Sequence, residues 1–451
     1  MARTMGGAPE PSDWWPASHE RVLERARDAD WPSDPGGIEE TTCTIIGQQV
    51  IENTAEHQTG HHFRPWLTSL VSRVGEAVRD GAVSARGEDW RSLWSLLRGL
   101  VLIAPLVTAS DEFKEVFPDI RFAYETAMAE AEKTAAELAQ AGLLADEWPV
   151  PEARPAGTPL VARDAYGSRF LIAAPFAYSG PPSGETADGE TAGGDAIADH
   201  WYAWDVDMCW IDMVVAAGVF RSEAEALSEW RSAVGAIAAS SQRSACEPPV
   251  AKWLLGSYLK GSVFGDMQQG NEPEELLREV FRSRRRAEIL AGAGLAGDPD
   301  ADQDPGSGPG RDRFLKQNPS WARKIRNEFR KWHAGRYGRR VAEVSQTAET
   351  IIDKWGPHDP FDERSFFACS PHRIEKAAVL IGDGFFDDYA ARAFRVLPDW
   401  VRWCAERSEI SGEAAERSFA VARAVSDLAA EKGPYAVVGR YEDDEPFRRA
   451  E

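Results

Sequence analysis

The sequence predicts a mainly α protein with a small inserted antiparallel β-sheet (α+β), built as two helical domains joined by a Gly-, Pro- and Asp-rich linker. Three observations support this fold class. Apolar residues recur at helical spacing through most of the chain. Between about residues 159 and 207 that spacing gives way to short apolar and β-branched runs. Residues 292–311 are dominated by linker-forming residues and separate two helical blocks.

The composition is that of a globular protein with real cores. A chain of 451 residues is long enough for two or three of them. Hydrophobic residues make up 43% and charged residues 27%, and the 17 tryptophans are anchors that mostly bury. The formal net charge of -22 disfavours general adhesion to nucleic acid or to anionic membranes, because the field of the whole molecule repels both.

Targeting and redox features predict a cytoplasmic protein. The first 20 residues lack the apolar stretch of a signal peptide. The apolar run 93–107 is shorter than the roughly twenty residues of a membrane span and includes Arg98, so we expect a buried helix and no membrane contact. The five cysteines are scattered without a C-x-x-C pair, which predicts reduced thiols. The dominance of Arg over Lys is typical of a GC-rich bacterial genome.

The first domain is expected over residues 37–291, after a loose Pro- and Gly-rich segment at 1–36. It begins with helices up to about residue 148, in which large apolar residues such as Trp66 and Leu70 share one face. Residues 159–178 then predict a β-hairpin. The acidic, near-repetitive insert that follows, at 179–199, lacks the apolar surface to order itself and is predicted to be disordered.

A third strand is expected immediately after the insert, where apolar and polar residues alternate up to Asp207. We expect it to pair with the hairpin across the insert, and a helix to begin at Met208. Helices resume with a capping box at Ser222 and continue to residue 291.

The second helical domain is expected over residues 312–433, after the linker at 292–311. Its last helix should stop at Gly433, which Pro434 follows. The acidic tail at 434–451 is expected to fray.

Two weak metal-ligand patterns occur in the first domain. His57 and His61 are four residues apart, a helical spacing at which two imidazoles can meet one metal ion. The intervening residues lack the Glu of the H-E-x-x-H motif, and Gly60 weakens a helix, so surface histidines at a helix end remain an alternative. Asp205 and Asp207 lie two apart at a predicted strand end, where carboxylates can bind a divalent cation or act as a base. Asp207 could instead cap the following helix.

Other catalytic motifs are incomplete. The acidic run in the linker resembles a calcium loop, but Gln303 and Pro309 stand where Gly and Glu are needed. No P-loop, nucleophile elbow or dinucleotide fingerprint is present. Cys369 precedes His372 by three residues, a spacing open to a thiolate–base pair, although a helix cap at Ser370 explains the segment more simply.

The stretch WARKIRNEFRKWHAGRYGRR (321–340) predicts an amphipathic helix after Asn318 and Pro319. Its aromatic stripe should pack on the protein, and its opposite side should be basic. The candidate anion-binding residues are Arg323, Arg326, Arg330 and Lys331. Residues 311–340 carry a net charge of +9. We expect the protein's own acidic surface to compensate this charge, and a nucleic acid partner to be less favoured but testable.

Two classes of function follow. The first is a non-enzymatic binding or regulatory module with a protein partner. The alternative is a metal-dependent hydrolase or transferase with a divalent ion held by histidine and aspartate near the small sheet. The sequence favours the first, because no catalytic motif is complete.

Overall fold

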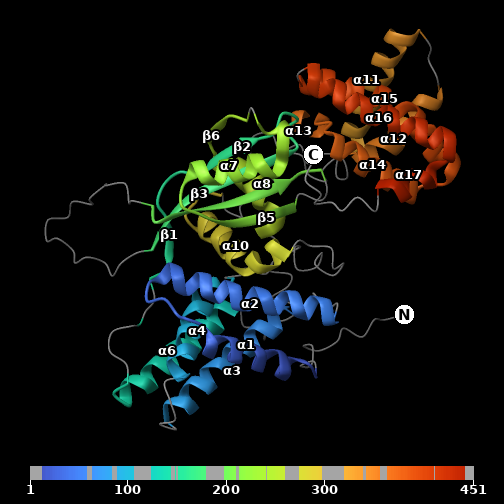
Figure 1. Cartoon of the computed structure of the whole chain (residues 1–451). Helices are drawn as coiled ribbons and strands as arrows, with labels where there is room; N and C mark the ends of the chain where they lie inside the picture. The colour runs from blue at the N-terminus through green and yellow to red at the C-terminus, as the bar shows by residue number, and fades with distance from the viewer. Residues whose placement is uncertain are drawn as a thin grey trace, which may run out of the picture.

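The structure is a computed structural model of the whole chain. It describes residues 13–57, 63–83, 89–105, 123–143, 148, 151–178, 198–209, 213–239, 241–259, 274–296, 319–338, 342–355, 363–410 and 412–441. The fold is mainly helical with one small antiparallel sheet, as the sequence predicts. The sheet lies between a group of N-terminal helices and a group of C-terminal helices (Figure 1).

The N-terminal helices pack around one apolar core. They are α1 (Trp15–Asp28), α2 (Pro35–His57), α3 (Phe63–Val83), α4 (Asp89–Ile103) and α6 (Ala123–Gln140). The predicted apolar faces lie in this core, where Trp66 and Leu70 are fully buried. Helix α1 lies within the segment 1–36, which the sequence predicts to be loose, and so corrects that prediction. Its Val22 and Leu23 are buried, so burial of an apolar face outweighs the Pro- and Gly-rich flanks.

The sheet has the strand order β5-β4-β3-β2-β6, with β1 paired to β3. The strands are β1 (Ala153–Pro155), β2 (Leu160–Arg163), β3 (Arg169–Tyr178), β4 (His200–Asp207), β5 (Met213–Phe220) and β6 (Arg243–Ala245). The predicted hairpin is β2–β3, and the predicted third strand is β4, which pairs antiparallel with β3. Residues 179–197, which contain most of the acidic insert, lie outside the described residues.

Strand β5 corrects the expected helix after Met208. It pairs antiparallel with β4, from Met213 opposite Asp207 to Phe220 opposite Trp201. The β-branched residues Val214 and Val215 favour a strand, and both are buried. The sheet is therefore larger than the expected range of about 159–207.

Helices cover both faces of the sheet. Helix α7 (Glu223–Val234) and the short η2 (Gly235–Ile237) pack on one face, and α8 (Pro248–Leu259) and α10 (Glu274–Gly292) on the other. Helix α10 belongs to two cores at once. Its Phe281 contributes to the N-terminal core and its Leu290 to the core under the sheet, so α10 lies between them (Figure 1).

The C-terminal helices form a separate apolar core. They are α11 (Pro319–Tyr337), α12 (Ala342–Trp355), α13 (Glu363–Phe367), α14 (Pro371–Gly384), α15 (Asp387–Ser408), α16 (Gly412–Lys432) and α17 (Pro434–Tyr441). Trp355 and Trp400 are its largest fully buried side chains, and Phe329 is fully buried in the same core. Helix α17 occupies the start of the segment expected to fray, because Val437 is buried against this core. Residues 297–318, which contain most of the expected linker, lie outside the described part of the chain.

Among the described helices, none combines the length and the apolar character that crossing a membrane requires.

Candidate functional site

The two aspartates predicted at a strand end both lie on β4, and they have different partners. The carboxylate of Asp205 accepts two hydrogen bonds from Arg169 of β3, to Oδ1 from Nε at 2.9 Å and to Oδ2 from a terminal nitrogen at 2.8 Å. Its Oδ1 also accepts from the indole of Trp230 on α7 at 3.0 Å. Asp205 thus receives its counter-ion and its hydrogen bonds from the protein itself. These contacts fit a structural role in which Asp205 joins β3, β4 and α7.

Asp207 has different partners. It is 1% exposed, its Oδ1 accepts the backbone N–H of Cys209 at 2.7 Å, and its Oδ2 lies 3.2 Å from Nε2 of His372 on α14. The Asp207 side chain shapes the turn between β4 and β5, so the suggested helix cap at this residue is wrong. Burial raises the pKa of Asp207, but the opposing effects of His372 and Arg169 and the Cys209 N–H hold it below its usual range.

Lys376 follows His372 by one turn of α14. Two residues four apart lie on one side of a helix, so both belong to the side that faces Asp207. Burial lowers the pKa of Lys376 to about 7, although the Asp207 carboxylate opposes the shift. A buried carboxylate, a partly exposed imidazole and an amine that titrates near neutrality therefore meet where the sheet joins the C-terminal helices. Such a group can hold and release a proton.

The neighbouring cysteines, Cys209 and Cys369, are buried, and neither is in a setting that favours a thiolate. Burial raises the pKa of the Cys209 thiol and of the Cys369 thiol to about 12. Ser370 accepts a hydrogen bond from the backbone N–H of Arg373 at 3.2 Å, at the start of α14. The helix-cap interpretation of this segment is confirmed, and His372 pairs with Asp207 rather than with a thiolate.

Of the four predicted metal ligands, only Asp205 and Asp207 have side chains in the described part of the chain. His57 is the last residue of α2, and its side chain, like the whole of His61, lies outside the described part of the chain. No group of three or more His, Cys, Asp or Glu side chains among the described residues could hold a metal ion. Asp207 does gain a histidine, but it is His372, separated by 165 residues, which no local spacing could have indicated.

A pocket of about 700 Å³ lies beside the β2–β3 turn. One wall is the turn Arg163–Gly167 with the segment Ser241–Ser244, and another comes from the C-terminal helices, including Ser408 and Ile410. An apolar wall contains Phe170 and Trp253, whose rings meet edge to face at 5.5 Å. The volume lies within the range of small-ligand and side-chain pockets, which form preferentially between structural units.

Strand β6 borders this pocket and ends the sheet. Cys246 donates its N–H to Pro159 of the β2 side at 2.7 Å, so the main chain of Ser244, two residues earlier, also faces β2. The alternate residues Arg243 and Ala245 therefore direct their N–H and C=O groups away from the sheet. All three β6 residues are exposed, and no described segment pairs with this outer edge.

The predicted basic helix is α11, and its cations divide into two groups. Arg326 pairs with Glu349 of α12 at 3.0 Å, and Arg336 pairs with Glu406 of α15 at 3.0 Å. The exposed Arg323, Arg330 and Lys331 have no acidic group within 4 Å among the described residues. The protein's own acidic side chains thus form ion pairs with only some of the cations of α11.

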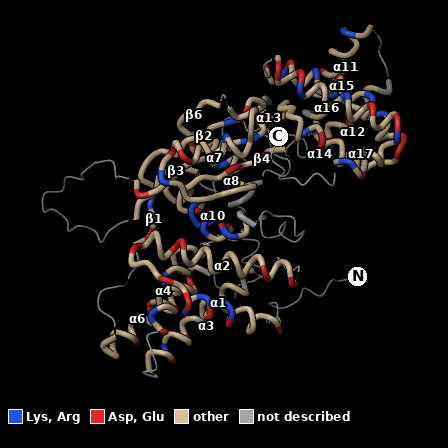
Figure 2. The backbone as a smooth tube through the Cα atoms, viewed as in Figure 1, with Lys and Arg blue, Asp and Glu red and all other residues tan. Residues whose placement is uncertain are grey.

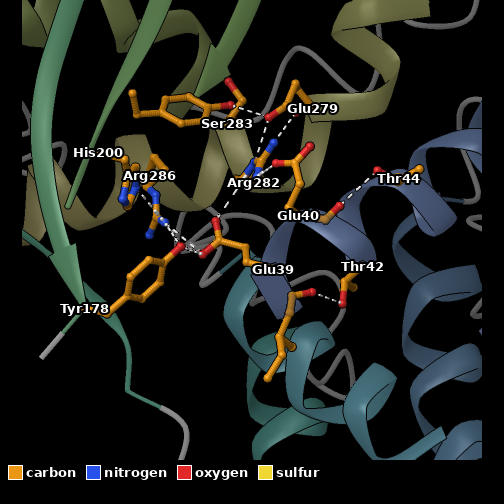
Figure 3. A network of polar contacts seen from close by, with 12 residues as sticks. Glu39, Glu40, Thr42, Thr44, Tyr178, His200, Glu279, Arg282, Ser283 and Arg286 are labelled. Carbon is orange, nitrogen blue, oxygen red and sulfur yellow. Dashed lines mark hydrogen bonds and ion pairs between the residues drawn. The ribbon is translucent and has the colours of Figure 1, made fainter. Parts of the chain in front are cut away.

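A network of buried ionic contacts, which the sequence reasoning missed, joins the N-terminal helices to the sheet (Figure 3). Glu39 of α2 and Arg286 of α10 are each 1% exposed, and a terminal nitrogen of Arg286 donates to Glu39 Oε2 at 2.8 Å. The Tyr178 hydroxyl donates to the same oxygen at 2.8 Å. The same Arg286 nitrogen lies 3.3 Å from His200 Nε2, which must accept because a guanidinium only donates.

Four arginines of α10 are nearly inaccessible: Arg282, Arg284, Arg285 and Arg286. Figure 2 shows basic residues along α10, which lies between the sheet and α2. Arg282 donates to Glu40 at 2.5 Å and to Glu279. The run RSRRRAEIL is the sequence feature that could have indicated these buried arginines. Its apolar residues place the helix inside the protein, so the arginines of the same run lie inside as well.

Comparison with protein-family models, with curated proteins and with solved structures found no match to this chain.

Proposed function

We propose that this chain is a non-enzymatic binding protein that holds an extended segment of a partner protein along the outer edge of β6. The observation that carries the proposal is the pocket of about 700 Å³ beside an exposed edge strand. An extended peptide can add a strand to such an edge, where main-chain hydrogen bonds supply affinity and side-chain pockets supply specificity.

The lining of the pocket indicates which peptide would fit. Phe170, Val250 and Trp253 offer an apolar wall for one apolar or aromatic side chain. Arg163 is exposed and has no acidic group within 4 Å among the described residues, so it can pair with a carboxylate of the peptide. Asp164, the buried carboxylate of the lining, accepts two backbone hydrogen bonds within its own turn. These features support recognition more than catalysis.

The test begins with selection of peptides from a random phage-displayed library on the full chain, followed by titration of a recovered peptide. Ala245→Pro removes an outward N–H that β2 does not use, and Ser244→Trp fills the pocket. Each should weaken binding at least tenfold, while Ser228→Trp on the exposed side of α7 should leave it unchanged. Recovered peptides that bind both β6 variants as tightly as the unaltered chain would refute the proposal.

A metal-dependent hydrolase or transferase is the second candidate, and the cluster of Asp207, His372 and Lys376 is the observation that favours it. A metal ion there would need a further ligand whose side chain is not among those described, such as His57 or His61. Excess zinc, manganese or magnesium should then raise the melting temperature, and Asp207→Asn should abolish the rise. An unchanged melting temperature with all three ions eliminates this candidate.

A further inference from the structure

Helix α11 is held in a fixed orientation by one apolar face. Ile325 and Phe329 are fully buried in the C-terminal core. The Phe329 ring lies 5.1 Å from that of Trp400 and 5.3 Å from that of Trp403. Because these contacts determine the rotation of the helix about its axis, the residues on its other side face solvent in a defined arrangement.

The flanks of α11 are neutralised by ion pairs. Arg326 with Glu349 and Arg336 with Glu406 are described above, and Glu328 lies 3.3 Å from Arg407. His333 also lies 3.3 Å from Asp399 of α15. These contacts connect α11 to α12 and α15, so the flanking charges serve the C-terminal unit itself.

The remaining cations form what we call the cationic stripe, made of Arg323, Lys324, Arg330 and Lys331. All four are exposed, and none has an acidic group within 4 Å in the part of the chain that the structure describes. Each arginine and each lysine recurs after seven residues, which is about two helical turns or roughly 10 Å along the axis. The stripe therefore presents four positive charges on one side of α11, a helix that lies at the outer end of the molecule (Figure 2).

The charge around the stripe differs from that of the whole chain. Residues 319–441 contain 20 Lys and Arg and 18 Asp and Glu, a net charge of +2, whereas the whole chain carries -22. Exposed charges more than a Debye length apart, about 8 Å at physiological salt, are largely screened from each other. The excess of negative charge elsewhere thus has little effect on an anion at the stripe.

We infer that the cationic stripe binds the phosphate backbone of nucleic acid without reading base sequence. Two of its four residues are lysines and none is apolar or aromatic. Protein interfaces are depleted in lysine and enriched in aromatic residues, whereas phosphates need only positive charges at a suitable spacing. This binding surface is separate from the β6 edge and does not depend on the function proposed for it.

The test is a titration of the full chain with a fluorescent 20-base-pair duplex of random sequence at several salt concentrations. Three to four phosphate contacts predict that log K falls with log salt with a slope of about -3 to -4. Arg323→Glu with Arg330→Glu should weaken binding at least tenfold and reduce the slope by about 2. These side chains are exposed and lack acidic partners, so the melting temperature should hardly change.

A matched control is Arg423→Glu with Lys432→Glu on α16, which changes the net charge equally at exposed positions away from the stripe. Binding of the duplex should survive in this variant. The inference is wrong if the unaltered chain fails to bind the duplex at low salt. It is also wrong if both double variants bind the duplex equally well. Competition by polyglutamate as strong as that by unlabelled duplex would also contradict it, because a protein-like polyanion would then suffice for binding.

Discussion

His200 lies on β4 against the buried arginines of α10, and this position determines its protonation. Burial, with the nearby Arg286 and Arg282, lowers its pKa to about 3. Burial likewise lowers the pKa of His19, on α1, to about 4. The folded protein therefore keeps both imidazoles neutral in a pH range where the unfolded chain protonates them.

Stability should accordingly fall as the pH drops from about 6.5 toward 4. In that window the unfolded state binds more protons, and each such histidine contributes up to about 1.4 kcal/mol per pH unit. His200→Gln keeps an acceptor for Arg286 but cannot titrate, so its free energy of unfolding should decline less steeply. Urea unfolding of the variant and of the unaltered protein at pH 7, 6 and 5 measures the difference. Equal slopes for His200→Gln and the unaltered protein would contradict the assignment.

Glu39 and Glu40 are adjacent carboxylates that differ in burial. Glu39 is 1% exposed and Glu40 57% exposed, and each contacts an arginine of α10. Glu39→Gln leaves buried arginine charge without its counter-ion and should cost about 3–5 kcal/mol of stability. Glu40→Gln should cost less than about 1 kcal/mol, because the Glu40 carboxylate is exposed to solvent and the buried Arg282 keeps Glu279 as a partner. Chemical denaturation measures the loss of stability in each variant. Similar losses in the two would contradict the claim that burial of the carboxylate determines the size of its contribution.

At the scale of secondary-structure elements, the sequence predicts the helices and strands whose apolar residues follow a regular spacing within the element. The helix with Trp66 and Leu70, the β2–β3 hairpin and the aromatic face of α11 are all present. Strand β5 was mistaken for a helix because its small residues lack a clear alternation, and its pairing with β4 decided the outcome. Asp207 could be singled out by its position at a strand end, but its partner His372 depends on how distant segments pack.

Close contact of α2 with α10 gives a prediction for glycine. A Cβ at Gly47 would lie 2.4 Å from the Cα of Arg278, a backbone atom that cannot move alone. Gly47→Ala should therefore destabilise the protein by about 1–3 kcal/mol despite the better helix propensity of Ala. Gly335→Ala in α11 meets nothing within 4 Å and should stabilise by about 0.5–1 kcal/mol. Thermal melts of both variants test the close packing of α2 on α10. A Gly47→Ala variant that melts at a higher temperature than the unaltered protein would contradict it.

At the scale of the whole molecule, the sheet and α10 connect chain segments that are far apart in sequence. Strands β3 and β4 pair over eight positions, from Arg169 opposite Asp207 to Phe176 opposite His200. The ionic network joins α10 to α2 from the other side. The C-terminal unit contacts the sheet through polar groups, since Arg373 of α14 donates to the carbonyl of Met208 at 2.9 Å.

A cut between β3 and β4 should therefore leave the molecule assembled. We expect that cleavage at a protease site introduced between residues 188 and 189 yields two fragments that co-elute in size-exclusion chromatography. Strand β3 before the cut stays paired with β4 after it, and α10, also after the cut, packs into the core of the N-terminal helices. Separation of the fragments without denaturant would contradict the sheet pairing.

The central claim, strand addition at β6, is tested most directly by hydrogen exchange of individual amides. With a selected peptide bound to the full chain, the amides of Arg243 and Ala245 should exchange at least tenfold more slowly, because they then donate to the peptide. The amide of Ser244 already faces β2 and should change much less. Protection that appears elsewhere while the Arg243 and Ala245 amides exchange at their free rates would contradict the account.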